Sequence, residues 1–214
     1  MLNFNYYNPT RILFGQGEHG RVGTYLKEQG ISKVLIVYGG GSALRNGTIA
    51  HVQASLEAEG IEYFTIGGVR PNPTLEFAEK VKNIAVQSGL ECLLAVGGGS
   101  VIDTCKVAAA WAKYDGDAWD FFTKGVKITD ALPIATVLTI PAAGSEQSMR
   151  VVISHNDLKL GTASEKIRPI LSVVDPELFF TLPKNQIAAG VVDMISHIFE
   201  RYFTNTEHTD FVSA

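Results

Sequence analysis

The most constraining feature of this chain is a pattern that occurs twice: a short apolar run ends in three glycines and a serine, and a helical pattern follows. The first copy follows residues 34–37 and consists of Gly39, Gly40, Gly41 and Ser42; the second follows residues 92–96 and consists of Gly97, Gly98, Gly99 and Ser100. Glycine lets the backbone approach a ligand where no side chain would fit, and the N-terminus of the next helix favours an anion. Both turns are therefore expected at one edge of an open α/β sheet, where they would suit a diphosphate.

The alternative is that these glycines serve only the turns. Neither copy matches the GxGxxG fingerprint or the GxxxxGK[ST] loop, so a nucleotide site does not follow from either copy alone. Ser100 is placed either to cap the following helix or to donate its hydroxyl to a ligand. The repetition of the pattern favours the ligand.

Strand-like and helical patterns alternate through the first two thirds of the chain, which predicts a parallel sheet with helices on both faces. Between residues 151 and 174 the pattern is strand-like but irregular. The expected strands are residues 4–7, 11–14, 34–37, 61–66, 92–96 and 134–140. We expect a first helix that ends at Gln29, then helices at 48–59, from the 71–74 turn to Gln87 and at 100–113, and a short helical segment at 119–122.

Composition excludes several classes of function. The chain has 214 residues, 46% of them apolar, and a formal charge of −4, which is typical of a globular protein with one core or slightly more. Its Lys and Arg residues are scattered, which argues against nucleic acid as a partner. We find no apolar run of about 20 residues and no signal pattern, so we predict no membrane association. Cys92 and Cys105 are interpreted as reduced core residues of a cytoplasmic protein.

A second domain is expected after Pro183. Beyond Asn185 only helical patterns occur, at 187–202 and from Glu207 onward, and residues 210–214 end within such a pattern. We therefore predict a domain at 1–183 and the incomplete beginning of a helical domain at 184–214, because so short a piece rarely folds unaided.

Asp193 and His197 lie four residues apart on the helical pattern of 187–202, so their side chains share one helix face. A carboxylate and an imidazole placed in this way can bind a divalent metal ion, although an ordinary surface pair is the alternative and two ligands complete no coordination shell. The other histidines, His19, His51, His155 and His208, are expected at the surface rather than as ligands.

The order of five motifs resembles the iron-containing alcohol dehydrogenase family, closest to its butanol dehydrogenase and aldehyde reductase branch. The motifs are Pro71-Asn72-Pro73-Thr74, the segment 97–103, the segment 138–146, Asp175-Pro176-Glu177-Leu178, and the segment from Leu182-Pro183 to Asp193 and His197. The resemblance implies a dehydroquinate synthase-like NAD(P) domain followed by a helical domain with a divalent metal, iron or zinc, held by one Asp and three His. Asp193 and His197 match the first two ligands, and the other two have no counterpart here.

The same resemblance implies roles for further residues. Gly98, Gly99 and Ser100 would bind the diphosphate, and Asp103 would lie near the ribose or the nicotinamide. Thr139 and Leu182 would line the nicotinamide pocket, while Asn72 and Lys159 would complete the cofactor site, the lysine at a ribose hydroxyl. The family often has Thr where this chain has Ala143.

The cofactor expected from the first glycine turn is NADP rather than NAD. Relatives specific for NAD tend to carry an Asp at the position of Gly39, whereas here backbone N–H groups and Arg45 would favour a phosphate. The implied reaction is hydride transfer between NADP(H) and an aldehyde or primary alcohol, in a homodimer that pairs through residues 4–7. Two alternatives remain: a relative of glycerol dehydrogenase or dehydroquinate synthase, or a non-catalytic nucleotide-binding fragment. The 214-residue chain itself is expected to be inactive.

Overall fold

Six parallel strands form the central sheet, in the order β1-β8-β5-β4-β2-β3, and this confirms the predicted parallel α/β fold. The computed structural model describes residue 3 and residues 5–203. The strands of this sheet are β1 (Arg11–Phe14), β2 (Lys33–Tyr38), β3 (Glu62–Gly67), β4 (Cys92–Gly97), β5 (Ile134–Leu138) and β8 (Leu171–Val174). Every residue of β4 and β5 is buried, as expected for the centre of a sheet that is covered on both faces.

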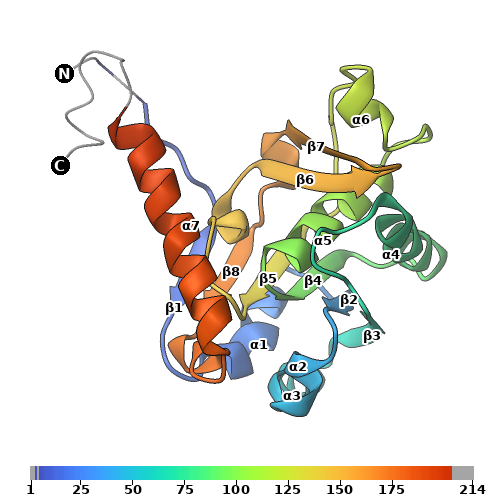
Figure 1. Cartoon of the computed structure of the whole chain (residues 1–214). Helices are drawn as coiled ribbons and strands as arrows, with labels where there is room; N and C mark the ends of the chain where they lie inside the picture. Colours follow the sequence, from blue (N-terminus) through green and yellow to red (C-terminus); the bar gives the residue numbers. More distant parts are fainter. Residues whose placement is uncertain (1–2, 4, 204–214) are drawn as a thin grey trace.

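Helices cover both faces of the sheet (Figure 1). Alternate residues of β2 and β4 point to opposite faces and join two separate apolar clusters. One cluster contains α1 (Val22–Glu28) and α3 (Thr48–Ala58), and the other contains α4 (Leu75–Gln87) and α5 (Gly99–Trp111). Gly30 and Gly60 follow α1 and α3 with φ of 75° and 65°, so the predicted glycine stops are confirmed.

A small antiparallel hairpin lies outside the main sheet, where the sequence predicts only irregular extended structure. It pairs β6 (Arg150–His155) with β7 (Leu158–Ala163). Asn156 and Asp157 form its turn with positive φ, a conformation that these two residue types tolerate. The hairpin contacts α4, α5 and the short helix α6 (Asp120–Thr123), so it covers one side of the site described below.

Short helical segments connect these elements. They are α2 (Ser42–Arg45) and the 3-10 turns η1 (Glu18–Arg21), η2 (Ser145–Gln147), η3 (Glu165–Ile167) and η4 (Pro176–Phe179). In the part of the chain that the structure describes, no helix is long and apolar enough to cross a membrane.

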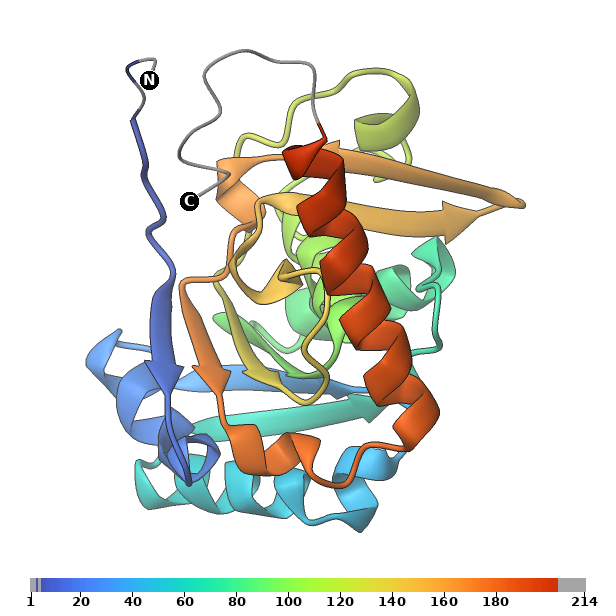
Figure 2. The ribbon, with the colours of Figure 1, turned by 60° about the vertical axis from the view of Figure 1, so that its left-hand side comes forward.

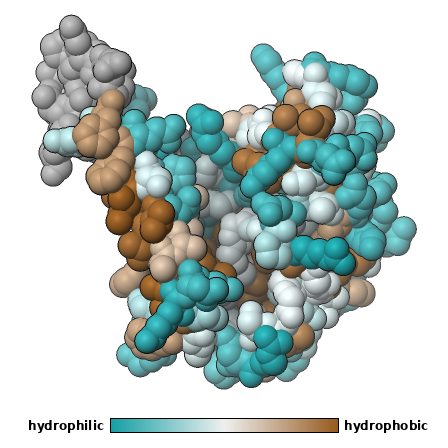
Figure 3. Space-filling model, in the orientation of Figure 1, coloured by the Kyte–Doolittle hydropathy of each residue, from teal (hydrophilic) through white to brown (hydrophobic). Residues whose placement is uncertain are grey.

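The helix α7 (Lys184–Tyr202) is the long helix drawn in red in Figure 2, and Gly190 is the only residue of it that is buried. It begins three residues before the predicted position. A Cβ on Gly190 would lie 2.9 Å from the carbonyl oxygen of Pro141, so this glycine allows α7 to approach that residue closely. The apolar side chains of α7 are otherwise exposed, and Figure 3 shows them as a brown band at the left. The domain boundary at Pro183 stays a prediction. Phe4, Glu207, His208 and residues 210–214 lie outside the described residues.

Candidate functional site

The two glycine turns lie side by side at the carboxyl edge of the sheet, as predicted. They follow β2 and β4, which are neighbouring parallel strands. The strand order reverses at this point, because β3 lies on one side of the pair and β5 on the other. The chain leaves β2 toward α3 on one face and leaves β4 toward α5 on the opposite face. Open α/β sheets bind their ligands outside such a reversal.

The second turn needs glycine for space rather than for backbone conformation, since residues 97–99 have no positive φ. A Cβ on Gly97 would lie 2.5 Å from Val101 Cγ2, and one on Gly98 would lie 3.3 Å from Ile140 Cβ. The helix α5 begins at Gly99 with Gly98 as its N-cap and no side-chain cap. The capping role considered for Ser100 is therefore wrong, and its role as a hydroxyl donor stays a prediction. We call the surface formed by Gly98 and Gly99 at the beginning of α5 the cradle.

The first turn combines backbone freedom with a cation. Gly41 has φ of 102°, and Arg45 Nη1 lies 3.3 Å from the position that a Cβ on Gly41 would occupy. A Cβ on Gly39 would lie 3.6 Å from the Val69 carbonyl oxygen, and one on Gly40 would have no atom within 4 Å. At this turn a ligand would therefore meet backbone groups and the guanidinium of Arg45, and no carboxylate at position 39.

Four other predicted cofactor residues lie around the same edge. Asn72 Oδ1 accepts a hydrogen bond of 2.9 Å from Lys159 Nζ, which joins the 71–74 turn to the hairpin. Asn72 has φ of 56°, the left-handed conformation that Asn adopts more readily than most residues. The amide of Thr139 donates to the Gly97 carbonyl oxygen at 3.1 Å, so Thr139 lies beside the cradle. Leu182 is half-buried in the turn before α7.

Asp103 uses both carboxylate oxygens within the protein. Oδ1 accepts from Ser145 Oγ at 2.7 Å, and Oδ2 accepts from the Val152 amide at 3.1 Å. Burial raises the pKa of Asp103, while Lys106 and these donors counteract that increase. The structure thus gives Asp103 a role in holding the segment from η2 to β6, and its predicted proximity to the ribose or nicotinamide stays a prediction.

Lys106, which sequence analysis did not single out, is fully buried on α5. Its ammonium donates to the carbonyl oxygens of Ser145, Ser148 and Arg150, each at 2.8 Å, and to Ser145 Oγ at 3.0 Å. Burial lowers the pKa of Lys106 to about 8, and the nearby charges of Asp103 and Glu146 oppose that decrease. The signal that could have found it is a lone lysine between Cys105 and Val107, because the rest of the helix after Thr104 is apolar.

The surface position predicted for His19 is wrong. This residue is 8% exposed, and its Nδ1 lies 2.6 Å from Asp175 Oδ2, while its Nε2 lies 3.0 Å from Nδ1 of the exposed His51. Burial acts to raise the pKa of the fully enclosed Asp175, but hydrogen bonds from His19 and from backbone amides outweigh it and lower that pKa. These residues come from η1, α3 and the end of β8, and the pairing of β1 with β8 brings the first and last of these together.

Asp193 and His197 share one face of α7, as the spacing predicts. Oδ1 of Asp193 lies 3.8 Å from Nε2 of His197, and both side chains are about half exposed, at 46% and 49%. Glu200 Oε2 lies at the same distance from His197 Nδ1. Among residue 3 and residues 5–203, no three His, Cys, Asp or Glu side chains are arranged to hold a metal ion. The pair can therefore supply part of a coordination shell.

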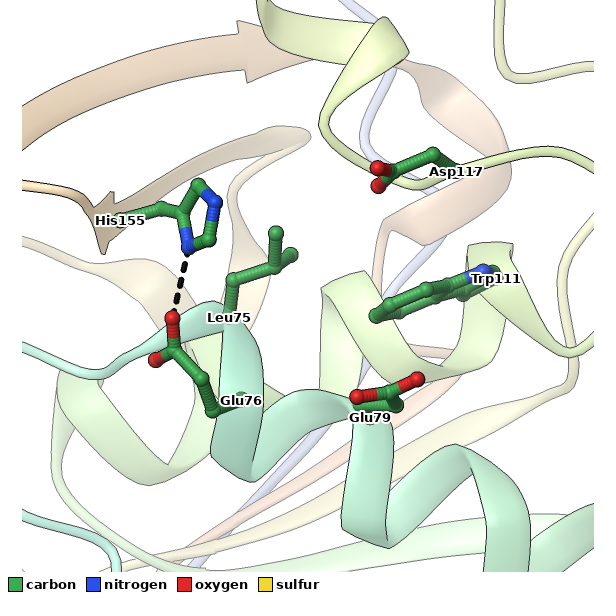
Figure 4. Close-up of a pocket in the computed structure, with 6 residues that line it drawn as sticks. All are labelled: Leu75, Glu76, Glu79, Trp111, Asp117 and His155. Carbon is green, nitrogen blue, oxygen red and sulfur yellow. Dashed lines mark hydrogen bonds and ion pairs between the residues drawn. The ribbon is translucent and has the colours of Figure 1, made fainter.

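A surface pocket lies between the beginning of α4, the end of α5 and the hairpin (Figure 4). His155, expected at the surface, is half-buried at its edge, and its Nδ1 lies 2.6 Å from Glu76 Oε1. The pocket is lined by Leu75, Glu76, Glu79, Trp111, Asp117 and His155.

Comparison with known proteins agrees with the motif order. The sequence profile of the family described as iron-containing alcohol dehydrogenase matches residues 9–176. A probable NADH-dependent butanol dehydrogenase 2 of Bacillus subtilis is 47% identical over 98% of this chain and 54% of its own length. The NADPH-dependent aldehyde reductase YqhD of Escherichia coli is 39% identical over 95% of this chain and 53% of its own length.

A solved structure shares the fold closely. The crystal structure of NADH-dependent butanol dehydrogenase A from Thermotoga maritima superimposes with a TM-score of 0.91 at 45% identity, over 94% of this chain and 51% of that chain. The chain thus spans about half the length of the relatives that it matches.

Proposed function

Because the chain belongs to the iron-containing alcohol dehydrogenase family, we propose that it binds NADP(H) for hydride transfer between this cofactor and an aldehyde or a primary alcohol. The observation that carries the proposal is the pair of glycine turns on either side of the point where the strand order reverses. When bound, NADPH would supply the hydride that reduces an aldehyde to a primary alcohol, and the two glycine turns would hold it at the carboxyl edge of the sheet.

Each predicted residue has a place in this proposal. Gly98, Gly99 and Ser100 hold the diphosphate at the N-terminus of α5, where backbone amides favour an anion. The linked pair Asn72 and Lys159 faces the ribose on the hairpin side. Thr139 and Leu182 line the nicotinamide end.

The preference for NADP over NAD rests on the first turn. Gly39 carries no carboxylate to repel a 2′-phosphate, and Arg45 lies against Gly41 in position to attract one. Among the relatives named above, the butanol dehydrogenases are called NADH-dependent and the aldehyde reductase NADPH-dependent, so both cofactors occur in this family.

The test compares the dissociation constants of NADP⁺ and NAD⁺ by calorimetry. We expect NADP⁺ to bind more tightly, and Arg45→Met to weaken NADP⁺ by about tenfold while NAD⁺ changes by less than about twofold. Arg21→Met, an exposed arginine on η1, is the matched control. Equal affinities for the two dinucleotides, unaffected by the Arg45 substitution, would contradict the proposed preference.

Asp193 and His197 fit a divalent metal ion, iron or zinc, in ligand type and in spacing. Bound there, the metal would act as a Lewis acid that polarises the substrate carbonyl. The residues themselves present a carboxylate oxygen and an imidazole nitrogen on one helix face. In the test, Zn²⁺ or Fe²⁺ retention by this chain should decrease for Asp193→Ala and His197→Ala, with Asp115→Ala, at an exposed carboxylate after α5, as control.

A second candidate function is nucleotide binding without catalysis. The observation that favours it is that the described residues supply two metal ligands and no third. Activity assays of the 214-residue chain test these candidates: reduction of butanal with NADPH would support the dehydrogenase and contradict the expectation that this chain is inactive, whereas binding without turnover would agree with that expectation and with the second candidate. Oxidation of glycerol in place of butanol would favour the glycerol dehydrogenase alternative. Homodimerisation and a cytoplasmic location stay predictions.

A further inference from the structure

A buried lysine joins α5 to the loop that faces the glycine cradle. The Lys106 ammonium has four acceptors, which all lie between Ser145 and Arg150. A lysine is almost never fully buried unless its charge is paired and hydrogen-bonded. This one lies three residues from Asp103 on the same helix face, and both side chains reach the same segment.

Ser145 is the centre of the contact. Its hydroxyl accepts from Lys106 Nζ at 3.0 Å and donates to Asp103 Oδ1 at 2.7 Å. Its carbonyl oxygen accepts a second bond from Lys106 at 2.8 Å. Two groups of opposite charge on α5 therefore determine where η2 lies.

The segment held in this way packs directly against the glycine turn. A Cβ on Gly99 would lie 3.9 Å from Ser145 Cβ, and one on Gly98 would lie 3.3 Å from Ile140 Cβ. The absence of a side chain at both positions therefore lets residues 139–150 contact the backbone of the turn. The position of this loop and the position of the turn depend on each other.

We propose that Lys106 is a positioning residue that holds the loop of residues 139–150 against Gly98 and Gly99 and thereby fixes the glycine turn that binds the diphosphate of the cofactor. The proposal rests on the proposed cofactor site. Lys106 acts through Ser145 and the backbone, and Asp103 acts with it from the preceding turn of the helix.

The first test uses Lys106→Met, which keeps an unbranched side chain and removes the donors. Lys113→Met, at an exposed lysine just after α5, is the control. We expect the dissociation constant of NADP⁺ to rise by about tenfold or more for Lys106→Met and to stay within about twofold for Lys113→Met. Hydrogen exchange of amides in residues 139–150 should accelerate by about tenfold, with β2 and β4 unchanged.

A second measurement separates positioning from a purely structural role. The charged groups around the ammonium are Asp103 on α5, Glu146 on η2 and Arg168 after η3. Because burial lowers the pKa of Lys106 to about 8, raising the pH through this value removes one N–H donor and the positive charge. The affinity of the unmodified chain for NADP⁺ should therefore fall between pH 7 and pH 9, and the affinity of Lys106→Met should not change.

The outcomes separate the proposed binding of NADP(H) from the proposed positioning role of Lys106. If Lys106→Met does not fold, Ser145→Ala replaces it; this variant removes the hydroxyl and leaves the three carbonyl acceptors, and we expect faster exchange in residues 139–150. If the unmodified chain binds no NADP⁺, the proposed function fails, and the exchange measurement alone decides whether the loop is held by Lys106. Binding that Lys106→Met or Ser145→Ala leaves unaltered, or exchange unaltered in the loop, would overturn the positioning role.

Discussion

Burial of Lys106 gives the folding stability a pH dependence that one substitution should remove. The pKa of this lysine falls from 10.5 in the unfolded chain to about 8 in the folded chain. Between these values the unfolded chain binds a proton that the folded chain does not, so the free energy of unfolding rises with pH. At about 1.4 kcal/mol for each pH unit, the total contribution is about 3 kcal/mol.

Other groups titrate in the same range with the opposite sign. Burial raises the pKa of the Cys92 thiol to about 12 and that of Cys105 well above 9. In the alkaline range the folded chain therefore retains thiol protons that the unfolded chain loses, and stability falls as pH rises through this range. The contribution of Lys106 is consequently measured as the difference between the unmodified chain and Lys106→Met, in which both thiols are the same.

The assay is urea denaturation followed by circular dichroism at several pH values from 7 to 9.5. The free energy of unfolding of the unmodified chain, minus that of Lys106→Met, should increase by about 2 kcal/mol over this range. Over the same range the affinity for NADP⁺ should fall. Deprotonation of Lys106 should therefore accompany a higher free energy of unfolding and weaker binding of NADP⁺. A difference that stays constant within about 0.5 kcal/mol would refute the reasoning, because the ammonium would then be as well solvated as in the unfolded chain.

Three further substitutions test the remaining geometry. Gly98→Val places a branched side chain in the cradle and should weaken NADP⁺ binding in calorimetry by about tenfold or more while the far-ultraviolet spectrum is retained. Gly23→Ala should lower the free energy of unfolding by about 3 kcal/mol or more, since its Cβ would lie 2.1 Å from the Ser55 carbonyl oxygen; a loss below about 1 kcal/mol would mean that α1 shifts easily. His19→Leu leaves the buried Asp175 carboxylate without this partner and should cost about 1–3 kcal/mol at pH 7. Because the pKa of Asp175 is lowered, that cost should disappear as the pH falls through the acidic range, and a cost independent of pH would contradict it.

Much of the fold could be predicted because its signals are local. An apolar run followed by glycine and a helical pattern marks the ends of β2 and β4, and Gly30 and Gly60 mark helix ends through their positive φ. The placement of both glycine turns at one edge follows from parallel strands alone. The hairpin β6–β7 was less visible, because most of its residues other than Val151 and Ile153 are at least partly exposed and the alternation is weak.

The contacts that escaped prediction are those that depend on topology. His19 and Asp175 are 156 residues apart, and they meet because β1 pairs with β8 at the edge of the sheet. Nothing near His19 in the sequence is apolar enough to indicate burial, since Glu18 and Arg21 flank it. A histidine in such surroundings is usually solvated, and only the strand order reverses that expectation.

The motif around α5 shows why residue type alone does not separate residues that contact a ligand from residues that hold the surrounding structure in place. Gly98, Gly99, Asp103 and Lys106 lie within nine consecutive positions, and a resemblance treats the motif as one unit. In the structure the glycines allow residues 140 and 145 to pack against the turn, while the carboxylate and the ammonium point to residues 145–152 and use their polar atoms there. A carboxylate with both oxygens already bonded within the protein is less available to a ribose than a free one. The motif therefore combines the glycine turn that we propose for the ligand with the two charges that hold the adjoining loop of residues 139–150 in place.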